Sequence, residues 1–236
     1  MKRIPIFFLL TYICLLSFVF SSCYDSQDVS NDLTTEKTYK TSETFKEPPS
    51  ELNIENWEDG LLFRGDCLVE VDRETEIEHI KIKEGTRRIE ASAFKWCDSI
   101  KSIVIPDSVE TLGSDAFSGN FDTVKIGKGL KNFVYSSFVT PAKRFVVDPE
   151  NEFLSNDSHG VLFNKDKTEL IRFPVASDIE KYEMPNTVKY IFGDNGYDFY
   201  GAFSNCAGNY NLKSVVIPES VESIGGAAFG ESRGLT

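Results

Sequence analysis

The sequence repeats one short pattern of apolar residues at nearly constant spacing along most of its length. Two landmarks recur in each copy, the isoleucine that closes an Ile-x-Ile step and a phenylalanine further on. Both are 23 residues apart in the first interval and 21 in the second (Ile82, Ile105 and Ile126; Phe94, Phe117 and Phe138). Because the two landmarks move in step, the chain consists of repeated units that are each too small to enclose a core.

The residue types of one unit indicate how such a core is built. In Ile103-Val104-Ile105 the two isoleucines point to one side of a short strand and Val104 points to the other. Proline cannot donate to a strand ladder, so Pro106 ends the strand. We expect the chain to turn inward at Val109 and Leu112 and to bend at Gly113. The back of the coil is then closed by Ala116-Phe117. Coils stacked with parallel strands ~4.8 Å apart form a solenoid.

The pattern I-x-I-P-x-x-V-x-x-I-G-x-x-A-F-x-x-C resembles the consensus of the BspA-like leucine-rich repeats of bacterial and protist surface proteins. The similarity covers roughly residues 58–230 and is strongest at 102–117 and 214–229. It is weak at 139–158, where Phe153 replaces the Ala-Phe step. The resemblance implies a leucine-rich repeat solenoid over 77–236. We expect about six coils with short parallel strands, an irregular or short-helical convex side and interspersed β-hairpins.

The hairpins are visible as a second repeated feature. Gly160-Val-Leu-Phe163 has a copy at Gly60-Leu-Leu-Phe63, offset by 100 residues, and each is followed by another apolar run. The array therefore repeats a hairpin-plus-coil unit. We interpret residues 51–76 as the N-terminal capping hairpin.

Residues 1–22 have the pattern of a signal peptide. Lys2-Arg3 precede an uncharged, mostly apolar run over 4–20, and then comes Ser21-Ser22-Cys23. This end resembles the lipobox of bacterial lipoproteins, in which the Cys is acylated, although that family favours Leu where Phe20 stands and Gly or Ala in place of Ser22. Plain secretion and a single transmembrane anchor are the alternatives.

Residues 23–50 would join this anchor to the folded repeats. The stretch is dominated by Ser, Thr, Asp, Glu and Lys, which cannot bury enough apolar area to offset chain entropy. We predict a lipidated Cys23 and a flexible tether with a reach of roughly 30 Å. The expected location is the bacterial envelope, at the outer membrane or cell surface, with periplasmic and external orientations both open.

Composition and motifs exclude several classes of function. The formal charge of −12 argues against nucleic acid, which needs a basic patch. The chain has only two histidines, so no metal site with several His ligands is expected. Asp157, Ser158 and His159 are sequence neighbours, which favours a turn over a catalytic relay. Cys97 and Cys206 occupy the consensus core position and Cys67 falls in the first hairpin. We predict no enzyme, no cofactor and no metal.

One coil departs from the repeat by an insertion of seven residues, DNGYDFY, at 194–200. Tyr197, Phe199 and Tyr200 could cover the adjacent coil or contact a sugar or protein ligand. Asp194, Asn195 and Asp198 could bind calcium weakly, although they lack the EF-hand spacing.

The outward positions of the strands carry the sharpest functional signal. Removing residues 1–22 leaves 23 basic against 37 acidic residues, a charge of −14, yet the twelve outward positions sum to +3. We name these twelve the strand row: Lys81, Val104, Lys125, Val146, Glu183 and Val216, with His79, Ser102, Thr123, Arg144, Lys181 and Ser214 two residues earlier. The row fits either an ordinary solvated sheet surface or a face that attracts acidic glycans or acidic protein segments. His79, Lys81, Lys125, Arg144 and Lys181 are the candidate contacts.

Three interpretations of function follow. The first is a lipid-anchored extracytoplasmic binding or adhesion module for a protein or acidic glycan. The second is a non-catalytic structural or accessory envelope lipoprotein that scaffolds a membrane complex, and the third is part of a longer adhesin. The last coil, with Val215-Val216-Ile217, is also expected to self-associate through its open strand edge.

The anchor can be tested by replacing Cys23 with Ala. We expect the variant to remain unprocessed or to appear in the soluble fraction, because the thiol that receives the lipid is gone. Metabolic labelling with a fatty-acid analogue, followed by fractionation, measures both effects. Labelling that survives the substitution would remove the lipoprotein interpretation.

Overall fold

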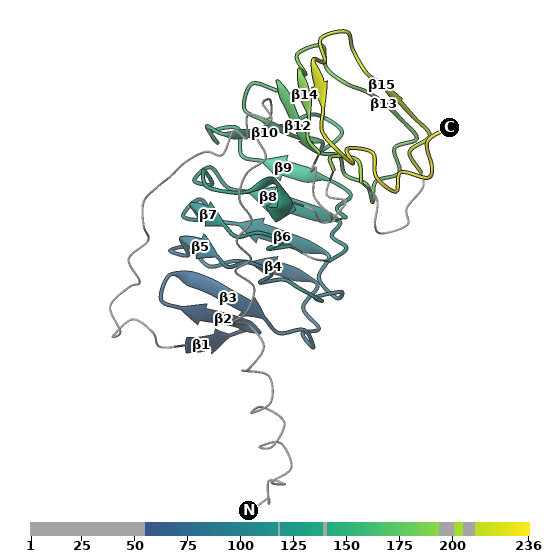
Figure 1. Ribbon diagram of the computed structural model, residues 1–236. Coiled ribbons are helices and arrows are strands. Elements are labelled where there is room, and N and C mark those ends of the chain that lie inside the picture. The colour runs from purple at the N-terminus through teal and green to yellow at the C-terminus, as the bar shows by residue number, and fades with distance from the viewer. Residues whose placement is uncertain (1–54, 118, 139–140, 194–200, 205–210) are drawn as a thin grey trace, which may run out of the picture. The chain divides into compact units, whose positions relative to one another are not determined.

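The computed structural model describes residues 55–117, 119–138, 141–193, 201–204 and 211–236. In this part the chain forms a β-solenoid of about six coils, which confirms the predicted fold class (Figure 1). The 3₁₀ helix η2 (Tyr135–Phe138) is the one helix in the described ranges. No helix there is long and apolar enough to span a bilayer.

The predicted Ile-x-Ile strands form a parallel ladder along one side of the coils. Four of them make one sheet in chain order: β4 (His79–Lys81), β6 (Ser102–Ile105), β8 (Thr123–Ile126) and β9 (Phe145–Val147). Two more form a separate parallel pair, β13 (Lys181–Glu183) and β15 (Ser214–Val216). The register places Lys81 beside Val104, Val104 beside Lys125, and Lys125 beside Val146.

A second row of strands runs along another side of the coils, and the sequence predicted its hairpins but not its two-residue strands. It begins with an antiparallel hairpin unit, continues with two-residue parallel strands, and occurs twice (Figure 1). The first copy is β1 (Glu55–Glu58), β2 (Leu61–Arg64), β3 (Cys67–Val71), β5 (Arg88–Ile89) and β7 (Thr111–Leu112). The second is β10 (Leu154–Asn156), β11 (Leu162–Asn164), β12 (Glu169–Arg172), β14 (Tyr190–Ile191) and β16 (Ser223–Ile224). Leu112 therefore lies in a strand and not only in an inward turn.

Stacked apolar side chains fill the interior between these two strand rows. Each column repeats one residue type from coil to coil, and the phenylalanines after the Ala steps are in contact. Phe94 and Phe117 have ring centroids 5.2 Å apart, and Phe203 and Phe229 stack at 4.7 Å. A fully buried side chain of this size contributes roughly 1.5–3 kcal/mol. Phe153 is not part of this column, because its side chain is 43% exposed, so it does not replace the missing Ala-Phe step.

The glycine at the bend of two coils, Gly113 and Gly225, has a different role from the predicted one. Neither Gly113 nor Gly225 has a positive φ. Instead, a Cβ at Gly113 would lie 2.3 Å from the backbone nitrogen of Ala91, and one at Gly225 would lie 2.4 Å from that of Gly193. Close approach of adjacent coils therefore requires these glycines. The left-handed residue of the bend stands two positions later, as at Asp115 (φ 50°).

The last coil exposes residues whose counterparts are buried in earlier coils. Ile217 is 42% exposed and Ile224 is 49% exposed, whereas Ile105 and Ile191 in the same columns are each 2% exposed. Within the described residues β15 pairs only with β13. The apolar columns therefore end in an accessible surface.

The crowding at Gly113 predicts a large effect of a single methyl group. Gly113→Ala should lower the free energy of unfolding by about 1–3 kcal/mol, because the contacting atoms are backbone and cannot rotate away. Ser114→Ala is the matched control, because Ser114 is the exposed neighbour of Gly113 in the same bend and its replacement adds no atom. Chemical unfolding measures both variants. Equal losses in the two would contradict the close-approach role.

The exposed last coil predicts self-association of the purified protein. Replacing Val216 and Ile217 with Lys should shift sedimentation toward the monomer, because charged edge residues oppose strand pairing. Val134→Lys is the control, as Val134 is 52% exposed on an inner coil. An unchanged sedimentation profile for the double variant would contradict the role of this edge.

Candidate functional site: a row of unpaired cations

The strand row lies on the outer side of the parallel strands. The alternation that buries Ile80, Ile103 and Val124 leaves their neighbours half-buried or exposed, and none of the twelve row residues is buried. The side chains of Lys81, Lys125, Arg144 and Lys181 are all exposed. The first two stand on alternate strands, so their Cα atoms are separated by about 10 Å.

These four cations differ from almost every other basic residue in the described part of the chain. Of the twenty lysines and arginines there, only five have no hydrogen bond, ion pair or aromatic ring as a partner for the side chain. Four of the five are Lys81, Lys125, Arg144 and Lys181, and the fifth is Arg73. Positive charge is therefore left without a counter-charge almost only on the strand row.

Just before the strands, charges are instead paired from coil to coil. Glu78, Lys101, Asp122 and Lys143 occupy equivalent positions in four successive coils and alternate in sign. Lys101 binds Glu78, and the Nζ of Lys143 lies 2.6 Å from Asp122 Oδ1. The hydrogen bond from Lys101 lowers the pKa of Glu78, and the one to Asp122 raises the pKa of Lys143.

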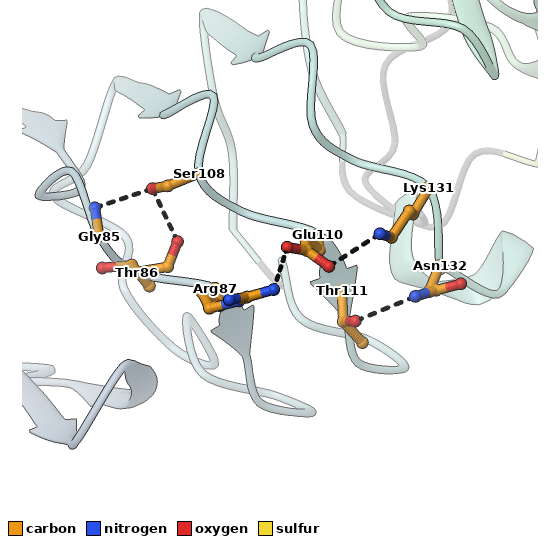
Figure 2. Close-up of polar contacts among 8 residues, drawn as sticks. All are labelled: Gly85, Thr86, Arg87, Ser108, Glu110, Thr111, Lys131 and Asn132. Atoms are coloured by element: carbon orange, nitrogen blue, oxygen red, sulfur yellow. Dashed lines mark hydrogen bonds and ion pairs between the residues drawn. The ribbon is translucent and has the colours of Figure 1, made fainter. Parts of the chain in front are cut away.

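Further pairs follow the strands, where Figure 2 shows one of them. Glu110 lies between Arg87 and Lys131 of the coils before and after it, and the Lys131 Nζ is 2.9 Å from Glu110 Oε2. The hydrogen bond from Lys131 lowers the pKa of Glu110. Lys128 is likewise 3.2 Å from Glu150. The unpaired cations thus stand between bands of compensated charge.

The strand row is divided between two sheets and is not continuous across all coils. β9 and β13 belong to different sheets, and the chain between them contains the second hairpin unit. At β9 the neighbour is the turn at 157–161, because the Phe145 nitrogen donates to the Gly160 carbonyl at 3.0 Å. Arg144, which directly precedes β9, and Lys181 on β13 are therefore associated with separate sheets.

That turn includes a residue that the sequence analysis did not count among the candidate contacts. The backbone nitrogens of His159 and Val161 donate to Asp157 Oδ1, each at 2.9 Å, and the Tyr182 hydroxyl donates to Oδ2 at 2.9 Å. The predicted turn is confirmed, and both carboxylate oxygens of Asp157 are occupied. His159 itself is exposed. Its position beside Gly160, in the copy of the first hairpin, was the available signal.

The other candidates fall into two groups. Cys23, Tyr197, Phe199, Tyr200 and Cys206 lie outside the described residues. His79 is exposed on β4, and its Nδ1 is 2.8 Å from the Ser102 hydroxyl on the neighbouring strand. It therefore stays on the strand row as predicted.

The described thiols are poor nucleophiles. Cys97 packs in the core and Cys67 lies in the first hairpin, as predicted. Burial raises the pKa of each to about 11, and a thiol is reactive only as its thiolate. Among the described residues, no three His, Cys, Asp or Glu side chains are grouped so as to hold a metal ion.

Comparison with solved structures returned repeat proteins at low identity. The pneumococcal vaccine antigen PcpA is 24% identical with a TM-score of 0.47, over 66% of this chain and 46% of that one. A leucine-rich repeat protein from Eubacterium ventriosum is 18% identical with a TM-score of 0.40, over 73% and 59%. A leucine-rich cell surface protein from Faecalibacterium prausnitzii is 14% identical with a TM-score of 0.29, over 77% and 72%. This chain therefore spans about half the length of the first two.

Sequence comparisons gave one assignment. A search of curated proteins found no match. The model of the BspA-type leucine-rich repeat region matches six copies, at residues 72–158 and 171–236. These ranges are more than half of the chain and include all six strands of the parallel ladder. The chain belongs to the BspA-type leucine-rich repeat family.

Proposed function

We propose that this protein is a lipid-anchored extracytoplasmic binding module that recognises an acidic ligand at its strand row. The observation that carries the proposal is that the cations of the strand row have no counter-charge among the described residues. In a protein with 37 acidic residues, Lys81, Lys125, Arg144 and Lys181 could each have acquired a carboxylate partner, as the flanking lysines have. Leaving them unpaired keeps their charge available to a ligand.

The arrangement suits an extended ligand that carries several negative charges. Sulfated or sialylated glycans and acidic protein segments are the two forms of such a ligand that we consider. The residues between the cations are Val104, Val146 and Thr123. Their side chains are short, so they project less far from the sheet than the charged groups do. Attraction of this kind raises the local concentration of an acidic partner and weakens with salt.

The N-terminal sequence supplies the proposed location. A signal peptide at 1–22 and acylation at Cys23 would place the repeats outside the cytoplasm, attached to a membrane by a tether of residues 23–50. The occurrence of BspA-type repeats in bacterial surface proteins supports this location. Acyl chains bury about 0.8 kcal/mol per methylene, so several chains on one cysteine give stable anchoring.

Charge reversal on the row tests the proposal. The double variant Lys125→Glu, Arg144→Glu should lose retention on acidic glycans in a glycan array, and native retention should fall between low and physiological salt. The matched control reverses Arg73 and Lys95, which changes the net charge equally but outside the strand row. We expect the control to keep most of its retention.

Two outcomes would contradict the proposal. Equal binding by the Lys125, Arg144 variant and the native protein would show that the row is not the site. Failure of the native protein to bind any acidic glycan or acidic polypeptide would remove the ligand class itself.

A further inference from the structure

The geometry points to His159 as an additional, titratable member of the strand row, located between Arg144 and Lys181, which strengthens binding of an acidic ligand as the pH falls. The inference rests on the proposed function and adds to it a residue and a mode of regulation. Sequence analysis interpreted His159 only as part of a turn, and the turn itself is confirmed. What the sequence did not indicate is where the fold places that turn.

The turn at 157–161 lies directly against the start of β9. Gly160 accepts a hydrogen bond from the Phe145 nitrogen at 3.0 Å. The two backbones approach so closely that a Cβ on Gly160 would lie 2.7 Å from the Cβ of Arg144. His159, the residue before Gly160, is therefore brought next to Arg144 at the edge of the four-stranded sheet.

The same turn is fixed to β13 on its other side. The His159 ring packs edge-on against the Tyr182 ring, with centroids 5.7 Å apart. Tyr182 is buried and directly follows Lys181 on β13. The contacts on both sides place His159 in the gap between the two sheets, where the row of cations would otherwise be interrupted.

The charged and titratable groups around His159 are two acids and two bases. From its own turn comes Asp157, whose Oδ2 is 3.7 Å from His159 Nδ1. Both Asp157 oxygens already accept hydrogen bonds, from two backbone nitrogens and from the Tyr182 hydroxyl. Burial raises the pKa of Tyr182, so the phenol stays neutral. Arg144, directly before β9, and Lys181 on β13 have no partner among the described residues, and Glu183 is the one acid on β13.

Protonation of the imidazole would therefore add a positive charge in the interval between Arg144 and Lys181. Histidine is mostly neutral at pH 7.5 and gains a positive charge toward pH 5.5. A positive charge added at this turn strengthens the attraction for an anionic ligand, so binding is expected to tighten at the lower pH.

The test uses heparin as the probe, because its sulfates remain ionised over the whole pH range. Affinity of the purified protein is measured by isothermal titration calorimetry at pH 7.5 and 5.5, at one ionic strength. We expect binding to be about two- to fivefold tighter at pH 5.5, the range that one added surface charge pair gives. His159→Gln should keep the affinity at pH 7.5 and lose most of the gain at pH 5.5.

Ser158→Gln is the matched control, because Ser158 is the exposed, uncharged neighbour of His159 in the same turn. It should keep the pH-dependent gain, and His79→Gln measures the share that the other exposed histidine of the row contributes. A gain that persists in full in His159→Gln, or that disappears only in His79→Gln, overturns this inference and leaves the proposed function intact. Absence of heparin binding by the native protein at both pH values, with none to other acidic glycans or polypeptides, overturns both.

Discussion

Every coil of this protein lies within hydrogen-bonding distance of the next along much of its path, and this constraint governs the sequence. The nitrogens of Gly113 and Gly225 both donate to a carbonyl of the preceding coil at 2.9 Å. At that separation a residue has its equivalent in the next coil as its nearest neighbour. This spacing accounts for the columns of apolar side chains, for the closely approached glycines and for the rows of ion pairs between coils. It also explains why side chains that point outward form rows and not scattered points.

The features of the fold that recur in every coil could be predicted, because a constant spacing of apolar residues is visible in the sequence. The spacing of Ile82, Ile105 and Ile126 gave the parallel ladder and its register, and therefore the exposed positions of Lys81 and Lys125. The repeat of Gly60 at Gly160 predicted the hairpins of the second row, but two-residue strands such as β7 contain no alternation, so no pattern could reveal them. Gly113 was misinterpreted because a glycine needed for close approach looks the same in sequence as one needed for a bend. His159 was missed because its position depends on contacts with Phe145 and Tyr182, which are 14 and 23 residues away.

The distribution of charge separates two uses of basic residues in one molecule. Lysines such as Lys101 and Lys131 join coils, and exposed pairs of this kind contribute little individually, about 0–1 kcal/mol. Their combined effect is to neutralise the bands on either side of the strands. The field over the strand row is then set by Lys81, Lys125, Arg144 and Lys181, with fewer competing carboxylates at hand. A weakly stabilising network can thus define where a strongly charged surface begins and ends.

The alternation of Glu78, Lys101, Asp122 and Lys143 restricts how an array of this kind can change length. Loss of one internal coil would bring Glu78 beside Asp122, or Lys101 beside Lys143, and like charges would face each other across the new junction. Loss of two adjacent coils would restore opposite neighbours. Insertion or deletion of an even number of coils therefore keeps opposite charges paired. An odd number brings like charges together and weakens the contact between coils.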